Sequence, residues 1–226
     1  MSNFFRFPHT PHLAWLSERS AREDKVLSAH EAKTLLKGIV TVEEKIDGAN
    51  LGISLNSSGE IQFQNRGEYL FEPYSGQFSR LSGWLRQHEY ALKKILRPEI
   101  ILFGEWCAAK HSLEYTHLED WFLLFDVYDR NLKKFWSIER RNLIAKDAGL
   151  AHVPKIYQGC ISISYAHDIL SSSKSKYRLG NPEGIIIRKD SEHWNEVRAK
   201  LVRPDFSQSI SEHWRKQSIT WNKCIE

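Results

Sequence analysis

The first part of the chain alternates short apolar stretches with polar turns. Residues 39–42 are all β-branched, residues 51–55 carry a large apolar side chain at every second position, and residues 61–63 follow the polar turn Asn56–Gly59. A period of two is typical of a strand with one buried face, and Asn and Gly favour turns. We therefore predict three consecutive strands that pair as an antiparallel meander.

The middle and the end of the chain add longer elements of both kinds. Apolar residues from Phe78 to Leu92 recur at helical spacing, and Ile138–Ala148 is a second predicted helix that ends at Gly149. Strands are predicted over Ile100–Trp106, Trp121–Tyr128, Gly184–Lys189 and Trp194–Leu201, and a closing helix after Pro204 carries Phe206, Ile210 and Trp214. The serine-rich residues 171–175 are typical of a surface loop. This order of elements predicts an α+β fold with mostly antiparallel sheets and flanking helices.

The composition is that of one folded domain. The 226 residues are 41% hydrophobic and 27% charged, which is too apolar for intrinsic disorder and sufficient to bury one core. No repeat or long linker divides the chain. We expect residues 1–226 to form a single domain, with 204–226 as a short C-terminal helical segment.

Charge and cysteine content indicate the cellular compartment and the kind of partner. The formal net charge of +4 is a modest excess, which suits contact with a phosphate backbone but does not by itself indicate it. Cys107, Cys160 and Cys224 include no CxxC pair, which argues against a disulfide framework or a zinc knuckle. The first twenty residues lack the apolar run of a secretory signal. We therefore expect a cytoplasmic protein without a membrane partner.

One segment carries candidate nucleophilic chemistry. Residues 43–50 read Glu-Glu-Lys-Ile-Asp-Gly-Ala-Asn and connect two predicted strands, where Lys45 can be exposed while Gly48 permits a tight turn. A Lys-x-Asp-Gly string also occurs in ordinary hairpin turns, so it decides nothing alone.

Four further segments place a charged residue in or beside an apolar, β-rich stretch. In chain order they are Phe103–Trp106, Leu124–Val127, Pro182–Lys189 and Val197–Lys200. Charges in such places are costly unless they converge on a ligand or on one another. The sequence has no GxxxxGK[ST] string, so a P-loop that cradles phosphates is excluded.

Taken together, the five motifs resemble the covalent nucleotidyltransferase superfamily of polynucleotide ligases and capping enzymes, and most closely the RNA ligases of the RNA ligase 2 type. The resemblance covers roughly Gly38 to Arg203. It implies an ATP-grasp-like ligase cleft between two antiparallel sheets. Only 26 residues follow Lys200, too few for an appended OB domain, so we expect a single adenylyltransferase domain. It also implies ATP as the nucleotide and Mg²⁺ or Mn²⁺ as the metal.

The resemblance assigns a role to each matching residue. Lys45 would be the nucleophile that becomes adenylylated, and Arg66, Arg198 and Lys200 the other catalytic residues. The implied nucleotide contacts are Glu44 at the adenine edge, Asp47 and Asn50 at the ribose or metal, Arg66 at the phosphates, Glu105 at a ribose hydroxyl, Phe125 against adenine, Glu183 through the metal, and Arg198 and Lys200 at the α-phosphate. Glu183 and Asp47 would bind the divalent ion. Phe125 also fits ordinary core packing.

Two features of these residues bear on the chemistry. The family usually has a lysine where this chain has Arg198, and arginine offers a planar, permanently charged fork in place of a point charge. A free lysine has a pKa of about 10.4, so attack by Lys45 on phosphorus requires neighbouring cations, a metal or desolvation to favour the neutral amine.

The function that the resemblance implies is an ATP-dependent RNA ligase. It would join a 3′-hydroxyl to a 5′-phosphate RNA end through a lysyl-AMP intermediate, alone or with a repair partner protein. A minimal ATP-dependent DNA ligase and an inactive, ligase-like module that binds nucleotide or RNA are the alternatives.

Overall fold

In the computed structural model, which describes residues 4–16, 25–204, 206 and 218–225, two antiparallel sheets face each other. The four-stranded sheet has the order β10-β9-β1-β8, with β1 at Ile39–Lys45, β8 at Lys155–Cys160, β9 at Gly184–Asp190 and β10 at Asn195–Val202. The six-stranded sheet has the order β4-β3-β2-β5-β6-β7, with β2 at Ala49–Leu55, β3 at Ile61–Gln64, β4 at Tyr69–Leu70, β5 at Ile100–Trp106, β6 at Phe122–Asp129 and β7 at Lys134–Phe135. The predicted α+β class with antiparallel sheets is confirmed.

The predicted meander is wrong in one pairing. β2 pairs with β3 as expected, but β1 pairs with β8 and β9 in the other sheet. The connection 46–48 therefore crosses from one sheet to the other instead of forming a hairpin. Alternation of apolar residues identifies strands, but it does not identify their partners.

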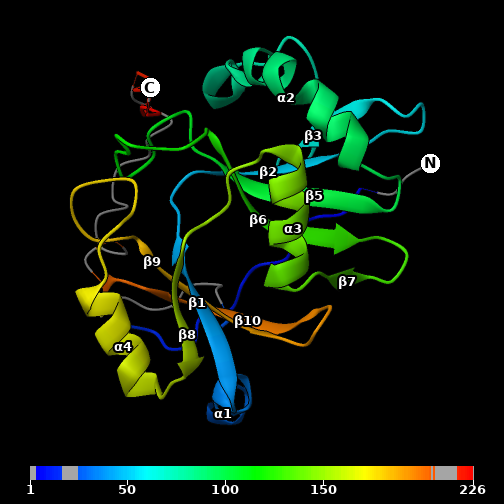
Figure 1. The fold of residues 1–226 in the computed structure, drawn as a ribbon. Coiled ribbons are helices and arrows are strands. Elements are labelled where there is room, and N and C mark those ends of the chain that lie inside the picture. Colours follow the sequence, from blue (N-terminus) through cyan, green and yellow to red (C-terminus); the bar gives the residue numbers. More distant parts are fainter. Residues whose placement is uncertain (1–3, 17–24, 205, 207–217, 226) are drawn as a thin grey trace.

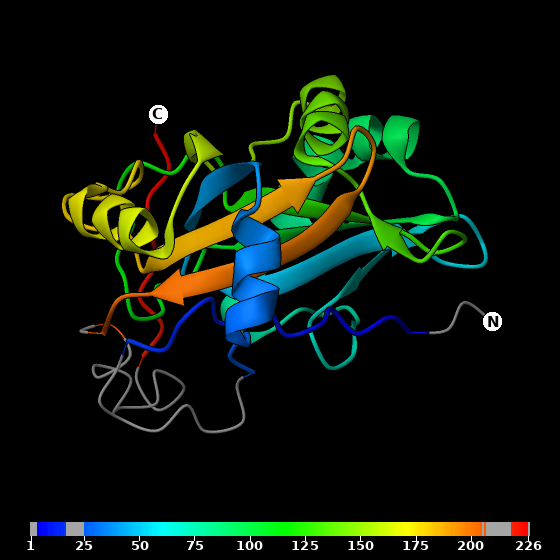
Figure 2. The same cartoon turned by 90° about the horizontal axis from the view of Figure 1, so that it is seen from below.

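The helices cover the outer faces of the two sheets (Figure 1). Helices α2 (Leu81–Ile95) and α3 (Ile138–Ala148) pack on the six-stranded sheet, in a core that includes Leu51, Ile53 and Trp84. Helices α1 (Ala29–Leu36) and α4 (Ile163–Ser172) bury Leu35 and Ile169 against the four-stranded sheet, across which α1 lies in Figure 2. The inner faces of both sheets are left to face each other.

Local sequence accounts for several helix ends. Ser28 and Glu31 form a capping box at the start of α1, in which each side chain accepts a hydrogen bond from the other's backbone N–H. Gly149 closes α3 as predicted, in the left-handed conformation at φ 61°. A short 3₁₀ helix at Gly76–Phe78 precedes α2.

One predicted loop is partly helical in the structure, and one predicted helix lies largely outside the described residues. Ser171 and Ser172 belong to the last turn of α4, so the loop expected at residues 171–175 begins only after them. The predicted closing helix around Ile210 and Trp214 lies outside the described residues. No helix in the described part of the chain combines the length and the apolar character needed to cross a bilayer.

Candidate active site

A cavity of about 700 Å³ lies between the inner faces of the two sheets. Strand alternation places Glu43 and Lys45 of β1 in the cavity lining while Val40 and Val42 pack into the outer core, although Glu44 at the end of the strand also reaches the lining. Of the residues that the sequence singles out, the cavity is lined by Glu44, Lys45, Asn50, Arg66, Glu105, Phe125, Arg198 and Lys200. Asp47 and Glu183 are not among the lining residues.

The amino group of Lys45 lies against a buried carboxylate. Lys45 ends β1 and pairs with Gly184, so Glu183 comes next to it, and Lys45 Nζ is 2.5 Å from Glu183 Oε2. Burial alone lowers the pKa of Lys45, but the Glu183 and Glu105 carboxylates outweigh it and the pKa is raised. Without a ligand, Lys45 is therefore held as an ammonium.

The two carboxylates beside Lys45 are hard to ionise. Burial raises the pKa of Glu105 to about 8, against the opposing effect of Lys45. Burial likewise raises the pKa of Glu183 to about 7, again opposed by Lys45. Such perturbed groups gathered in one cavity are typical of a functional site.

The turn after Lys45 is fixed from one side. Asp47 Oδ2 accepts hydrogen bonds of 2.7 Å from the N–H groups of Ser112 and Leu113, and the Asp47 N–H donates to the Tyr115 hydroxyl at 2.8 Å. Gly48 has a reason different from the expected tight turn: a Cβ there would lie 2.7 Å from the Trp106 carbonyl oxygen. Glycine is required because the turn packs directly on β5.

Arg198 is held by an acidic neighbour rather than left free in the cavity. Its Nη1 lies 2.7 Å from Asp126 Oδ2, and its guanidinium lies 4.1 Å from the centre of the Phe135 ring. Asp126 also pairs with buried Arg188 at 2.7 Å. Any phosphate contact by Arg198 is shared with this ion pair.

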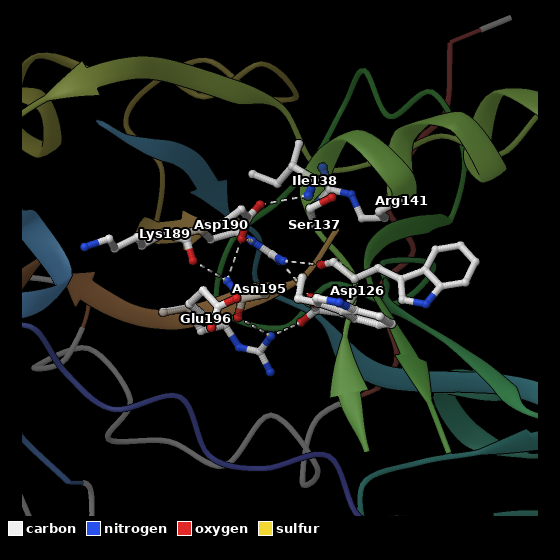
Figure 3. A network of polar contacts seen from close by, with 12 residues as sticks. Asp126, Ser137, Ile138, Arg141, Lys189, Asp190, Asn195 and Glu196 are labelled. Carbon is white, nitrogen blue, oxygen red and sulfur yellow. Dashed lines mark hydrogen bonds and ion pairs between the residues drawn. The ribbon is translucent and has the colours of Figure 1, made fainter. Parts of the chain in front are cut away.

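A buried network supports the wall behind Arg198. Arg141 forms a two-pronged ion pair with Glu43, with distances of 2.6 and 3.2 Å, and donates to the carbonyl of Phe125 at 2.8 Å. Asp190 accepts hydrogen bonds from the Ile138 N–H and from Asn195 Nδ2, which ties α3 to the β9–β10 hairpin (Figure 3). These contacts fix the backbone from which Phe125 enters the cavity.

The remaining predicted residues differ in their surroundings. Arg66 Nη1 lies 3.3 Å from His9 Nδ1, and Lys200 lies on β10 beside Arg198 in the cavity lining. Asn50 pairs with Glu105 across β2 and β5, and its buried Oδ1 has no hydrogen-bond partner among the described residues. Glu44 lines the cavity, but its Oε2 accepts from the Lys176 N–H, and burial raises its pKa.

The N-terminal segment contributes a part of the cavity that the sequence motifs do not reveal. Phe7, His9 and Thr10 line it together with His111 and Gln77, which contact each other at 2.7 Å. The cluster of aromatic residues near the N-terminus is the one signal in the sequence that something packs there. None of the five motifs includes these residues.

The carboxylates near Lys45 are suited to Mg²⁺ or Mn²⁺ when water and phosphate oxygens supply the remaining ligands. Oxygen donors from Glu183, Glu105 and Asp47 are the type that Mg²⁺ and Mn²⁺ prefer. The described residues hold no group of three or more His, Cys, Asp or Glu side chains arranged for a metal. Carboxylate oxygens of this kind fit an ion bound by one or two carboxylates and completed by water and phosphate oxygens.

The fold is similar to that of solved RNA ligases. Naegleria gruberi RNA ligase variants solved with ATP and Mn and with AMP and Mn give TM-scores of 0.59 and 0.58, both at 16% identity, over 80% and 78% of this chain. The same ligase with pyrophosphate gives 0.61 at 18% identity over 79% of this chain. This chain covers about half of the length of those ligases, 54%, 53% and 53% respectively.

Sequence comparison gives the family directly. No curated protein sequence matches this chain. The family model described as RNA ligase matches residues 38–202, which include all five motifs and most of the described residues. The chain therefore belongs to the RNA ligase family.

Proposed function

We propose that this protein is an ATP-dependent RNA ligase that works through adenylylated Lys45. The observation that carries the proposal is the placement of Lys45 in the cavity lining, with its Nζ 2.5 Å from the buried Glu183 carboxylate and under the electrostatic influence of Glu105. The solved ligases that share this fold include forms with ATP and Mn, with AMP and Mn and with pyrophosphate. Those ligands support ATP as the nucleotide.

The residues of the cavity, together with Glu183 and Asp47, which do not line it, divide into three groups around a bound nucleotide. Phe125 stacks on adenine, with Glu44 at the base edge, while Glu105 and Asn50 accept hydrogen bonds from the ribose hydroxyls. Arg66, Arg198 and Lys200 place positive charge at the phosphates, where charge develops in the transition state. Glu183 and Asp47 would hold a divalent ion, which supplies positive charge at the phosphates and favours the ionised carboxylates.

Lys45 then acts as the nucleophile. Its ammonium first gives up a proton to solvent, which the cations around the phosphates promote by lowering the pKa of the amine. The Nζ lone pair attacks the α-phosphorus, a P–N bond forms, and the bond to the β-phosphate oxygen breaks to release pyrophosphate. The β1 end and the Asp47 contacts hold the amine in place, which is the main contribution that a protein makes to phosphoryl transfer.

Two further transfers complete the reaction. An oxygen of the RNA 5′-phosphate attacks the Lys45-bound phosphorus, which breaks the P–N bond and leaves an RNA that carries AMP through a pyrophosphate bond. The RNA 3′-hydroxyl then attacks the 5′-phosphorus, forms the phosphodiester and releases AMP. We propose RNA with these two end groups as the partner of the cavity, and a cytoplasmic location.

The test is a sealing assay on matched substrates. The protein is incubated with ATP and either Mg²⁺ or Mn²⁺ and with nicked duplexes whose ends are RNA or all-DNA, each with a 5′-phosphate or a 5′-hydroxyl. We expect sealing of 5′-phosphate RNA by the wild type and by Lys37→Ala, an exposed lysine remote from the cavity lining, and none by Lys45→Ala. Preferential sealing of all-DNA nicks would assign the protein as a DNA ligase, and nucleotide binding without any adduct would make it a binding module.

A further inference from the structure

The connection between β5 and β6 is unusually long. Residues 107–121 contain no helix or strand, although every one of them is described. Connections of this length without regular structure are uncommon in compact domains and are often functional. Because backbone N–H and C=O groups need partners, the contacts that hold this loop in place are informative.

The C-terminal segment 218–225 supplies many of those partners. Thr220 and Lys223 accept hydrogen bonds from the N–H groups of Lys110 and Leu118, and the Lys223 N–H donates to the Tyr115 carbonyl at 3.0 Å. The segment lies against the loop in both views (Figures 1 and 2). It therefore links the early and the late part of the β5–β6 loop.

Asn222 makes this link with its side chain. It is 3% exposed, its Oδ1 accepts from the Tyr115 N–H at 2.8 Å, and its Nδ2 donates to the carbonyls of Cys107 and Ala109 at 2.8 and 3.3 Å. A buried amide that uses both of its ends in this way specifies one arrangement of the loop.

The other face of the same loop holds the nucleophile turn. The N–H groups of Ser112 and Leu113 bind Asp47 Oδ2, and the Tyr115 hydroxyl accepts from the Asp47 N–H. Tyr115, which is fully buried, thus touches Asn222 through its backbone and Asp47 through its hydroxyl. Because Asp47 is two residues from Lys45, a displacement of the loop also displaces the attacking amine.

We propose that Asn222 is a positioning residue for adenylylation, which sets the Lys45–Gly48 turn through Tyr115 and the β5–β6 loop. This rests on the proposed function, because its effect is on the rate at which Lys45 is adenylylated. Asn222 does not line the cavity, so it makes no direct contact with a nucleotide bound there and acts through the loop. It also lies outside the 38–202 region matched by the family model, so the C-terminal segment completes a site built from that region.

The test uses single-turnover adenylylation of the full chain. Asn222→Ala is expected to lower the rate at saturating ATP about tenfold or more, because small displacements of a nucleophile are costly. The half-saturating ATP concentration should stay within about twofold of wild type. The control is Lys223→Ala, since the Lys223 side chain is exposed and its loop contacts are made by its backbone.

A double-mutant cycle separates positioning from general loss of stability. Tyr115→Phe removes only the hydroxyl that receives the Asp47 N–H. If Asn222 acts through Tyr115, Asn222→Ala slows the Tyr115→Phe protein much less than it slows the wild type. Amide hydrogen exchange at Ser112 and Leu113 should also rise in Asn222→Ala and stay unchanged in Lys223→Ala. Asn222→Asp, which keeps the acceptor and loses the donors, serves as a second variant if the alanine variant does not fold.

The outcomes are distinct. A wild-type protein that forms no adduct would refute the proposed function. The exchange measurement would still show whether Asn222 holds the loop in place. A wild type that forms the adduct, together with folded Asn222 variants that react at the same rate, would refute the positioning role. Independent, multiplicative effects of Asn222→Ala and Tyr115→Phe would refute the route through Tyr115.

Discussion

At the scale of the residue, the direction of each side chain on β1 determines its chemistry. Glu43 and Lys45 face the cavity and Val42 faces the core, while the Glu44 carboxylate bonds to the backbone of Lys176. The Lys45 amine contacts Glu183 and is influenced by Glu105, two carboxyl groups whose pKa values are raised by burial. Lys45 is therefore protonated in the protein without ligands, and a bound nucleotide and metal must lower its pKa before it can attack.

Replacing Glu105 tests its raised pKa through stability. The pKa of Glu105 is about 8 in the folded protein and about 4.3 in an unfolded chain, so between these values the folded state binds the extra proton and stability falls as the pH rises. Glu105→Gln mimics the neutral form and escapes this loss. The melting temperature of Glu105→Gln, measured by thermal unfolding without nucleotide, should therefore rise relative to that of the wild type as the pH increases from 5 to 9. A difference between the two proteins that stays constant over this range would contradict the raised pKa.

The pH dependence of adenylylation should follow the same groups. Lys45 must lose its proton, and Glu183, with a pKa of about 7, must lose its own to bind a cation. Both requirements are met better at higher pH. We expect the single-turnover rate of adduct formation at saturating ATP and metal to increase from pH 6 to pH 8. A rate that falls over this interval would show that the protonated groups are the reactive ones.

Sequence reasoning reached the charged residues of the cavity but not all of their neighbours. Lys45, Glu105 and Lys200 could be predicted because each lies in a motif with its own order and spacing, and the structure brings them to one cavity. Phe7 and His9 could not, because they reach the cavity from a segment without regular structure. Long-range packing of such a segment leaves no periodic signal.

At the scale of the element, the strongly apolar strands were the easiest to predict. β5, β6 and β9 are buried on both faces over much of their length and read as apolar runs. β8 was missed because it is an edge strand with exposed and half-buried positions and a glycine. Helix α1 was not predicted, although Ser28 followed three residues later by Glu31 is the sequence pattern of a capping box.

Close packing of β5 on β6 gives a paired prediction. A Cβ on Gly104 would lie 2.3 Å from the Phe122 ring and 2.8 Å from the Leu123 carbonyl oxygen. Gly104→Ala should therefore lower the free energy of unfolding by about 1–3 kcal/mol.

The matched control lies in α2, where Gly83 has nothing closer to an added Cβ than Arg86 at 3.8 Å. Gly83→Ala should raise the free energy of unfolding by roughly 0.5–1 kcal/mol, because alanine loses less backbone entropy in a helix. Urea denaturation measures both variants. Equal effects of the two substitutions would show that space around Gly104 is not limiting.

At the scale of the whole molecule, the crossing of the chain between the two sheets explains the site. β1 and β2 belong to different sheets, so the turn from Lys45 to Gly48 lies where the sheets meet. The sequence predicted both strands but not this separation, because a short connection between strands also suits a hairpin. Long-range pairing of β1 with β8 and β9 decides the architecture, and no local pattern encodes it.

The N-terminal segment ties the two sheets together across the cleft. Phe7 is 4% exposed and packs on Phe103, Phe125 and Phe135, while Leu13 bonds through its N–H to Lys200 on the four-stranded sheet. Phe7→Ala should lower the free energy of unfolding by about 3–5 kcal/mol and weaken nucleotide binding, because it removes a wall of the cavity.

The control for this variant is Phe71→Ala, since Phe71 is 77% exposed and should cost little. Urea denaturation, with nucleotide binding by calorimetry on the folded protein, checks both effects. A Phe7→Ala protein as stable as Phe71→Ala would mean that the segment does not brace the cleft.

The most direct test of the central claim is covalent labelling of the protein with nucleotide. Wild-type protein, treated with pyrophosphate to remove any AMP already bound, is incubated with α-labelled ATP and a divalent metal and then denatured. We expect label on the wild-type and Lys37→Ala chains, released by acid and stable to alkali, with none on Lys45→Ala. Label that persists on Lys45→Ala, or its absence from wild-type protein, would contradict Lys45 as the nucleophile.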